Sequence, residues 1–539
     1  MEGKTSMEKQ GDGVLDALVV GLGITGIYQL HKLNQAGLQV RAVEAGSGVG
    51  GTWFWNRYPG ARFDSESYLY AYFASEDLYK RWRWSEHYAG QPEIEAYLNE
   101  AVREFELTDL ISLDTRVEAM EFDAERAVWN VRTNRGETIT TRFVVPALGF
   151  LSRPLFPEIP GRDSFAGPQY HTGLWPDDAV DLTGKRVGII GVGSSGVQLA
   201  TEIADRVEHL TIFQRHPNWC TPLNNSAITD EEHAEIWDSF EDYHQRTLNS
   251  YGGFLEVPLE EPGAYAQHTP ARRREMFDHI WKMRGSNKFF SNYPEVGAAG
   301  EANKEFCDYM AEQIRARVND PETAELLIPD HAYGAKRPPF ESGFYEIFNQ
   351  PNVTLVSTLH TPIERITESG VSTTDGDHEL DVLIFATGFR AVTGSYDAID
   401  IRANGKKLTD QWADGPQTYL GIITPGFPNM LNAFGPQSPG GNAPRCAERI
   451  CDFIADLVIE ARRRDVSIVD APEELARDYT DELAQQVAGT IYEKTEDWRS
   501  GSNIPGKKQV YMFYQAGLSQ HTARLNAVEA NGFEGFVFA

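Results

Sequence analysis

The sequence predicts an α/β protein with two Rossmann-like dinucleotide-binding domains and a helical insertion in the second of them. Three observations lead to this prediction. A GxGxxG fingerprint follows a short apolar run near the N-terminus, and a second one follows another apolar run near residue 190. From about residue 219 to residue 332 the pattern is instead polar with helical periodicity. A chain of 539 residues has room for this arrangement, because domains typically hold about 100–200 residues.

The first unit begins with DALVVGLGITGIYQLHKL, which predicts a buried strand, a glycine turn and an amphipathic helix. Its glycines are Gly21, Gly23 and Gly26, and the next predicted strand, LQVRAVEAG, carries Glu44 near its end. Such a turn lets the backbone approach a pyrophosphate at the positive end of the helix. A carboxylate at the end of the second strand accepts hydrogen bonds from ribose hydroxyls, which favours FAD or NAD.

The second unit is KRVGIIGVGSSGVQLATEIA, with Gly191, Gly193 and Gly196, followed by the predicted strand HLTIFQR. This strand ends in Gln214 and Arg215, where no acidic residue stands. An arginine cannot accept a hydrogen bond from a ribose, but it can donate to a 2′-phosphate. The second fingerprint therefore predicts an NADP site.

Helices are predicted at RRREMFDHIWKM and EFCDYMAEQIRARV, strands resume at VTLVSTL and ELDVLIFATGF, and the tail is helical from about residue 445 to residue 492. The predicted domains comprise five segments: the first part of an FAD-binding domain over 1–151, the first part of an NADP-binding domain over 152–218, a helical insertion over 219–332, the second part of the NADP-binding domain over 333–386, and the second part of the FAD-binding domain with a mobile C-terminal loop over 387–539.

The charge balance is strongly acidic, with 49 basic and 79 acidic residues and a net charge of −30. This excess argues against nucleic acid and anionic membrane surfaces as partners. No apolar run approaches the roughly 18 residues that span a bilayer, and the N-terminus lacks a signal-peptide pattern. The four cysteines are scattered without metal-ligand spacing. We expect a cytoplasmic protein without metal, as a monomer or a weak homo-oligomer.

Four further motifs carry a resemblance to a known family. They are GGTWFWNRYPGARFD (50–64), FAGPQYHTGLWP (165–176), AKRPP (335–339) and WRSGSNIPGK (498–507). Together with the two fingerprints, they resemble the type I Baeyer–Villiger monooxygenases. The identifying pattern of that family is F-x-G-x-x-x-H-T-x-x-W followed by Pro or Asp, and every position is matched here by Phe165, Gly167, His171, Thr172, Trp175 and Pro176. The resemblance extends over nearly the whole chain.

The resemblance implies an enzyme that binds FAD and NADPH and uses O2 to convert a small-molecule ketone, cyclic or bulky, into an ester or lactone. In the family, a C4a-peroxyflavin attacks the carbonyl carbon. The stretch with His171 is implied to lie in the hinge between the domains, with a structural and coupling role. The motifs Ala147-Leu148-Gly149 and Ala386-Thr387-Gly388 are implied to cross between the domains.

The resemblance also implies roles for individual residues. Arg337 matches the active-site arginine, Asp64 the carboxylate that pairs with it, and Lys336 the neighbour that reaches the 2′-phosphate. Trp498 matches a tryptophan on the mobile loop, although the following Arg-Ser-Gly-Ser departs from the family pattern. The remaining matches are expected to bind the cofactors: Thr52, Trp53, Phe54, Trp55 and Tyr70 the flavin, and Ser194, Ser195 and Gln198 the second nucleotide.

Two other functions compete with this hypothesis. An N- or S-oxygenase of the same flavin class would share the fingerprints, but Thr172, Trp175 and Arg337 favour ketone oxidation. A flavoprotein reductase or a non-catalytic nucleotide sensor would have no need for Asp64, Lys336 and Arg337 together. Product analysis distinguishes the first alternative, and NADPH oxidation without substrate distinguishes the second.

Overall fold

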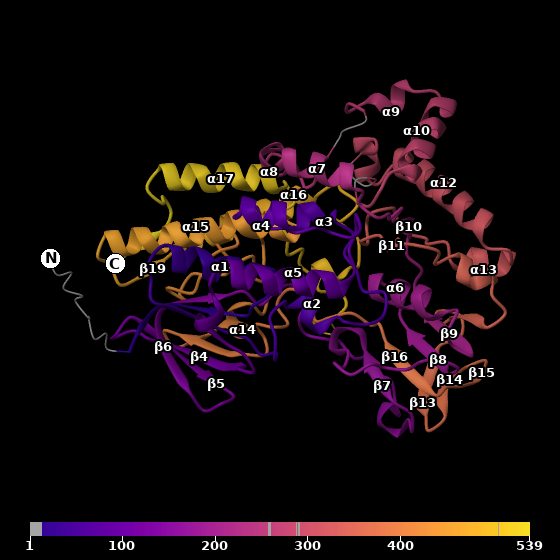
Figure 1. Cartoon of the computed structure of the whole chain (residues 1–539), viewed down its shortest axis with the longest axis horizontal. Helices are drawn as coiled ribbons and strands as arrows, with labels where there is room; N and C mark the ends of the chain where they lie inside the picture. Colours follow the sequence, from indigo (N-terminus) through magenta and orange to yellow (C-terminus); the bar gives the residue numbers. More distant parts are fainter. Residues whose placement is uncertain (1–12, 257–259, 287, 289–290, 505) are drawn as a thin grey trace.

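The fold is described from a computed structural model that covers residues 13–256, 260–286, 288, 291–504 and 506–539. Two separate sheets organise the chain (Figure 1). The larger sheet has eight strands in the order β18-β17-β4-β5-β6-β1-β2-β3, and the smaller has five strands in the order β12-β9-β8-β16-β7. Both sheets contain parallel neighbours joined through a helix, as the two fingerprints predict.

The larger sheet combines six strands from the first 146 residues with two strands near residue 400. Its members are β1 (Leu15–Val20), β2 (Val40–Val43), β3 (Ile111–Ser112), β4 (Val117–Asp123), β5 (Val128–Thr133), β6 (Thr138–Pro146), β17 (Asp400–Ala403) and β18 (Lys406–Lys407). The antiparallel hairpin formed by β4 and β5, with β6 beside it, was not predicted from the sequence. The helices associated with this part of the chain are α1 (Ile24–Gln35), α2 (Thr52–Trp55), α3 (Ser67–Tyr70), α4 (Glu76–Arg81), α5 (Gln91–Glu104), α14 (Leu408–Gln411), α15 (Ala443–Arg463), α16 (Glu473–Val487) and α17 (Leu518–Ala530).

The smaller sheet contains the second fingerprint. Its strands are β7 (Gln169–His171), β8 (Arg186–Ile190), β9 (His209–Gln214), β12 (Val353–Ser357) and β16 (Val382–Phe385), with helix α6 (Ser194–Ile203) after β8. A separate antiparallel sheet beside it contains the strands β13 (Ile363–Thr367), β14 (Gly370–Thr373) and β15 (Gly376–Glu379) (Figure 1). Both sheets draw their strands from the two separated segments assigned to each domain, and the domain boundaries themselves stay a prediction.

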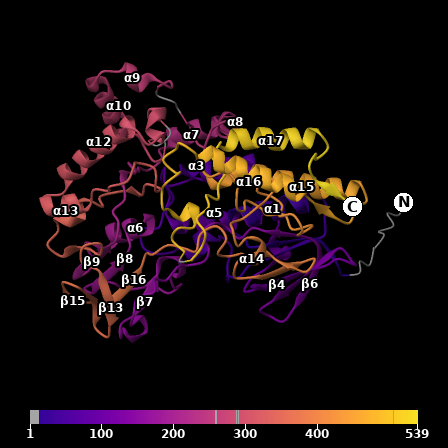
Figure 2. The same ribbon diagram turned by 180° about the vertical axis from the view of Figure 1, so that it is seen from behind.

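The segment between β9 and β12 is largely helical. Its helices are α7 (Asp230–Asp238), α8 (Phe240–Leu248), α9 (Ala264–Gln267), α10 (Pro270–Lys282), α12 (Glu301–Arg317) and α13 (Pro321–Leu326). Figure 2 shows α9, α10, α12 and α13 as a separate group beside the smaller sheet, and α7 and α8 next to the larger part of the molecule. Two-residue strands pair β10 (Thr221–Pro222) with β11 (Phe340–Glu341) and β19 (Val469–Asp470) with β20 (Val537–Phe538).

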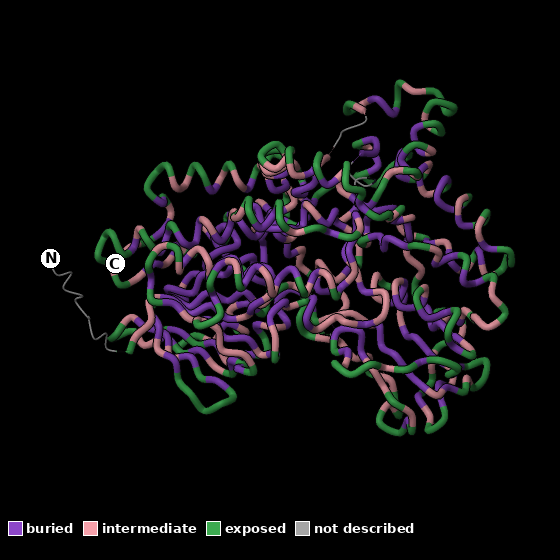
Figure 3. The backbone as a smooth tube through the Cα atoms, viewed as in Figure 1, coloured by how far each residue is buried: buried purple, intermediate pink, exposed green. Residues whose placement is uncertain are grey.

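Each sheet has its own apolar core, and buried backbone runs through the interior of both parts (Figure 3). In the larger part, α1 packs against α15, where Ile27 and Leu30 share a cluster with Ile450 and Leu457. The Tyr28 hydroxyl donates to Asp452 Oδ1 at 3.0 Å across the same contact. In the described residues, no helix is long and apolar enough to cross a membrane.

Candidate functional site

The two glycine turns have the same construction. In each, the first glycine faces the carbonyl of an alanine: a Cβ added at Gly21 would lie 2.7 Å from Ala147 O, and one at Gly191 would lie 2.5 Å from Ala386 O. Both glycines have positive φ values, 98° and 108°. The two Ala-x-Gly motifs therefore belong to the glycine turns, because the backbone of each motif packs directly against the first glycine of a turn.

The third glycine of each turn allows the helix to sit on the strand. A Cβ at Gly26 would lie 1.9 Å from Gly21 O, and one at Gly196 would lie 2.2 Å from Gly191 O. Real Cβ atoms do not approach a backbone oxygen so closely, so only glycine fits at either position. Helix–strand contact of this kind is what the third glycine of a dinucleotide turn provides.

The helix ends at these turns fit a pyrophosphate. Helices α1 and α6 have glycine N-caps, Gly23 and Gly193, with no side-chain capping bond and no acidic residue in the first turn. Their first N–H groups are therefore left for an anion at the positive end of the helix dipole. Gly23 also meets Gly51, whose Cβ would lie 2.7 Å from Gly23 Cα, so two backbones without side chains form the bottom of the first turn.

Glu44 is positioned for a ribose. It is buried, and its two oxygens accept hydrogen bonds from Leu22 N and Gly46 N, both at 2.8 Å. A carboxylate has about four acceptor sites, so two remain for ribose hydroxyls. The residues of the first turn thus fit the adenosine half of FAD.

At the second turn, the charge has the opposite sign. Arg215 is exposed at the end of β9, next to His216 and close to Lys336. The pKa of His216 is lowered, first by partial burial and then by the charges of Lys336 and Arg215, whereas Asp330 and Glu496 oppose this shift. Lys336 and Arg215 thus form a cationic cluster around His216. Among the described residues, no carboxylate lies within ion-pair distance of Arg215 or Lys336. This cluster fits a 2′-phosphate. Gln214, by contrast, is buried and donates to Leu326 O at 2.7 Å.

Arg337 and Asp64 meet between the two parts of the chain. The guanidinium Nη2 pairs with Asp64, and Nη1 donates to Ser194 Oγ at 3.0 Å. The Arg337 side chain is 46% exposed and that of Asp64 is 16% exposed, so the carboxylate lies in the wall and the guanidinium faces open space. Three residues that are distant in sequence are thus brought together at the N-terminus of α6.

Of the predicted flavin residues, Trp53 and Tyr70 share one aromatic cluster, and Phe54 and Trp55 form a separate ring pair. Trp53 Nε1 donates to the Tyr70 hydroxyl at 3.1 Å, and burial raises the pKa of Tyr70 to about 12. Phe54 is packed tightly into its own loop, because a Cβ at Gly46 would lie 2.6 Å from its ring. Thr52 is exposed and Trp55 is half-buried.

The stretch that carries the family pattern contributes the edge strand β7 to the smaller sheet. His171 is 2% exposed at the end of the edge strand β7; burial lowers its pKa to about 4, so the ring is neutral at pH 7. Its Nδ1 accepts from Gly173 N at 2.9 Å. The adjacent Thr172 donates to Ser195 Oγ at 3.2 Å, and Asp177 forms an ion pair with Arg57 of the first sheet's loop.

The C-terminal segment contacts the loop that precedes Arg337. Trp498 begins the short helix η6 (Trp498–Ser500) and packs edge-on against Phe513, with ring centroids 5.7 Å apart. Arg499, where this chain departs from the family pattern, pairs with Asp497 at 2.7 Å and donates to Ala335 O. Sequence reasoning missed this contact, which ties the segment to the loop two residues before Arg337. Within the described chain, no cluster of His, Cys, Asp and Glu could hold a metal ion.

Comparison with known proteins gives three kinds of similarity. Residues 18–243 match the family model described as pyridine nucleotide-disulphide oxidoreductase. The chain is 39% identical to phenazine N-monooxygenase from Lysobacter antibioticus and 38% identical to cyclopentanone 1,2-monooxygenase from Comamonas sp.; each alignment covers 97% of this chain and 96% of the relative. The crystal structure of OTEMO in complex with FAD and NADP superimposes with a TM-score of 0.93 at 36% identity, over 97% of this chain and 99% of that chain.

Proposed function

Because this chain belongs to the flavin-dependent Baeyer–Villiger monooxygenases, which use FAD and NADPH, we propose that it inserts one oxygen atom of O2 beside the carbonyl of a cyclic or bulky ketone. The product is an ester or a lactone. Overall, a ketone, O2, NADPH and a proton give the ester, water and NADP+. The cytoplasmic location stays a prediction from the sequence.

The single observation that carries this proposal is the position of Arg337. It stands at the N-terminus of the second nucleotide helix, paired with Asp64 from the first unit and bonded to Ser194. When the carbonyl carbon of a ketone is attacked, negative charge develops on the carbonyl oxygen, and a fixed cation where the two units meet stabilises that charge. Heteroatom oxidation or simple NADPH oxidation has less use for it.

The bound cofactors supply hydride transfer from NADPH to FAD and the reductive activation of dioxygen. Arg337 provides a fixed positive charge for the oxygen anion that develops on the ketone when its carbonyl carbon is attacked. Of its five N–H donors, two are engaged by Asp64 and Ser194, which leaves three outside the hydrogen bonds of the described residues. Asp64 holds the guanidinium plane in place. An arginine suits this position because it stays protonated and cannot quench a basic oxygen nucleophile.

We expect the segment around Trp498 to limit the access of water to the space beside Arg337. Phe513, which packs against Trp498, lies edge-on to Phe150 with ring centroids 4.9 Å apart, and Phe150 lies edge-on to Phe434 at 4.7 Å. An apolar cover of this kind strengthens the interactions of Arg337, because it lowers the local dielectric constant.

N-oxidation is the second candidate, and the similarity to a phenazine N-monooxygenase supports it. A planar aromatic amine would suit the aromatic rings under the C-terminal segment. Ketone oxidation takes precedence because the pattern from Phe165 to Pro176 is complete and the Arg337–Asp64 pair is formed.

The test uses purified protein reconstituted with FAD, supplied with NADPH and O2. The substrate panel runs from cyclopentanone and cyclohexanone to macrocyclic and steroid ketones, with phenazine and a thioether in parallel. A product heavier by one oxygen atom and identified as an ester or lactone supports the proposal. N-oxide formation without any ester moves the assignment to the second candidate, and NADPH oxidation that yields only hydrogen peroxide rejects both.

Replacement of Arg215 by alanine is expected to raise the KM for NADPH about tenfold, with little change for NADH, because only NADPH carries the 2′-phosphate. The measurement is steady-state kinetics with both nucleotides, together with the Kd of NADP+. Arg365→Ala, an exposed arginine on β13, is the matched control. An equal effect on both nucleotides would remove Arg215 from the phosphate site.

Trp498→Ala is expected to uncouple the reaction: NADPH is still consumed, but most of the electrons appear as hydrogen peroxide because water reaches the site. The ratio of ester to NADPH consumed measures this, and we expect it to fall at least about threefold, since the loss of one aromatic contact costs on the order of 1 kcal/mol. Trp237→Ala, in the remote helix α7, is the control. Unchanged coupling in the Trp498 variant would show that the segment is not a cover.

A further inference from the structure

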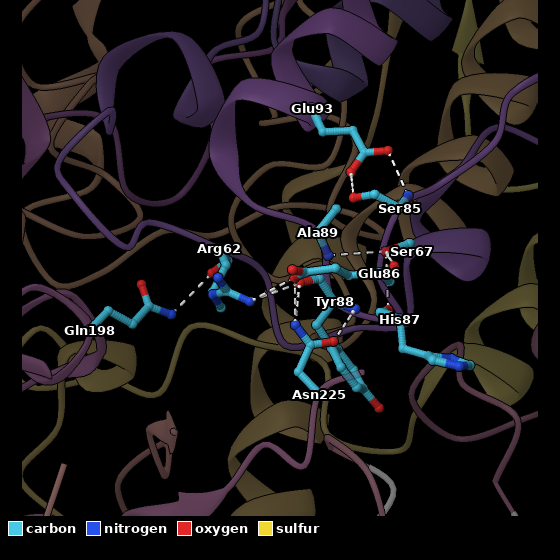
Figure 4. Close-up of polar contacts among 10 residues, drawn as sticks. All are labelled: Arg62, Ser67, Ser85, Glu86, His87, Tyr88, Ala89, Glu93, Gln198 and Asn225. Atoms are coloured by element: carbon cyan, nitrogen blue, oxygen red, sulfur yellow. Dashed lines mark hydrogen bonds and ion pairs between the residues drawn. The ribbon is translucent and has the colours of Figure 1, made fainter. Parts of the chain in front are cut away.

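Gln198, one helical turn after Ser194 on α6, forms its hydrogen bonds with residues of the first unit. Its Nε2 donates to Arg62 O at 3.0 Å, and its Oε1 accepts from the Tyr58 hydroxyl at 2.7 Å. Figure 4 shows the side chain reaching Arg62. Both ends of the amide are therefore engaged by the loop that leads to Asp64, which belongs to the other half of the site. The sequence predicts a nucleotide contact for Gln198, and these two protein partners were not predicted.

The backbone of this loop lies directly on α6. Gly60 has a φ of +80°, and a Cβ there would lie 2.9 Å from both Gln198 O and Glu202 Cβ. Ser194, Gln198 and Glu202 are spaced four residues apart, so they share one helix face. That face carries three contacts in a row: Ser194 with Arg337, Gln198 with Tyr58 and Arg62, and Glu202 with Gly60.

The opposite side of the loop is also held. Arg62 Nη1 donates to Glu86 Oε2 at 3.0 Å and to Tyr88 O at 3.2 Å. Asn225, at the start of the helical segment, donates to the same Glu86 oxygen at 2.6 Å and accepts from Tyr88 N at 3.0 Å (Figure 4). Residues 58–62 are thus fixed between α6 and this second cluster.

The loop connects these contacts to the chemistry. Asp64 is two residues beyond Arg62, and Tyr58 is buried near the ion pair: burial raises its pKa, Arg337 opposes this shift and Asp64 adds to it. A change at the Gln198 amide therefore moves the carboxylate that orients Arg337. Ser194 and Gln198 fix the guanidinium and its partner from the same helix, at neighbouring turns.

We propose that Gln198 is a positioning residue of the oxygenation step, which acts through Tyr58 and Arg62 to set the Asp64–Arg337 pair against Ser194. This inference rests on the proposed function. The amide does not bind NADP; it joins the nucleotide helix to the loop of the flavin unit. When the hydrogen bonds of the Gln198 amide with Tyr58 and Arg62 are removed, NADP binding is retained and oxygen transfer is lost.

The experiment is a double-mutant cycle between Gln198→Met and Tyr58→Phe in the FAD-loaded enzyme, with Thr201→Ala as a control. Thr201 lies on the same helix, and among the described residues its hydroxyl donates to Val197 O alone. Four quantities are measured: the Kd of NADP+ by flavin difference absorbance, the rate of flavin reduction by NADPH, kcat and KM for the oxygenated product, and the melting temperature.

Each single variant is expected to lower kcat about fivefold to tenfold, as the loss of one buried hydrogen bond predicts, with the Kd of NADP+ within twofold of the parent. The double variant should have the same kcat as Gln198→Met alone, because Gln198→Met already removes the bond that Tyr58→Phe removes, in addition to the bond with Arg62 O. Two results would overturn the inference: a Kd of NADP+ that rises as much as kcat falls in Gln198→Met alone, or strictly additive effects of the two changes.

The product formed by the parent enzyme shows whether the proposed function or this inference has failed. If the parent forms an N-oxide and no ester, the proposed function fails, and the same cycle is read on the N-oxide. If it forms only hydrogen peroxide, the cycle is read on the rate of hydrogen peroxide release and on the Kd of NADP+. In that case non-additive release rates with an unchanged Kd support the inference, whereas additive rates reject it.

Discussion

Replacement of Arg337 by alanine is expected to lower ester formation by at least about 10²- to 10³-fold, while NADPH still reduces the flavin at close to the normal rate. The reason is the geometry of the pair: Arg337 is held by Asp64 and Ser194 but presents its remaining N–H groups to open space. Removal of the cation leaves the oxygen anion of the attacked ketone without a partner, whereas hydride transfer between the two nucleotides makes no use of it.

Stopped-flow absorbance measures the reduction step, and product analysis measures the oxygenation step in the same preparation. Arg337→Lys tests the role of the planar fork, since lysine keeps the charge but cannot bond Asp64 and Ser194 together in the same way. Arg142→Ala, an exposed position on β6, is the control. Normal ester formation by the alanine variant would remove Arg337 from the reaction.

The second large effect concerns the glycine turns, which allow each cofactor site to be disabled separately. Gly26→Ala places a Cβ 1.9 Å from Gly21 O, and Gly196→Ala places one 2.2 Å from Gly191 O. Each clash forces the helix away from its strand, so the N–H groups that face the pyrophosphate move with it. We expect the Gly26 variant to be purified without bound FAD, and the Gly196 variant to keep FAD but to lose NADPH-dependent reduction at least about 100-fold.

The ratio of flavin to protein absorbance and the Kd of NADP+ measure the two losses. Gly297→Ala is the matched control, because a Cβ at that glycine meets no atom within 4 Å. A Gly26 variant that carries FAD and loses only NADPH binding would show that the two turns have been assigned to the wrong cofactors.

Much of this architecture could be predicted because glycine marks the turns of a βαβ unit. VTLVSTL was predicted as a strand over 353–359, and β12 spans Val353–Ser357; the two fingerprints likewise fall between β1 and α1 and between β8 and α6. What could not be predicted is pairing over long distances. Strands β17 and β18 complete a sheet that begins near residue 15, and no local pattern specifies that neighbour.

The site shows the same limit. The resemblance supplied Asp64 and Arg337, which are 273 residues apart, and the structure brings them together. The Gln198 amide has the same hydrogen-bonding groups whether it faces a nucleotide or a loop, so the sequence could not specify its partners. Tyr58 and Arg62 became its partners only because the first unit docks on α6, and that docking depends on tertiary packing.

The larger sheet also dictates an order of events on the ribosome. Helix α1 needs α15 to cover its apolar face, and the residues that meet there, Tyr28 and Asp452, are 424 positions apart. At about 5–20 residues per second, their synthesis is separated by roughly 20–85 s. The smaller sheet, by contrast, has all its strands by residue 385, so it can form before α15 is available to pack against α1. A nascent chain is therefore expected to contain a folded smaller unit before the larger unit is complete. Until α15 has been made, the apolar face of α1 stays exposed and can bind chaperones.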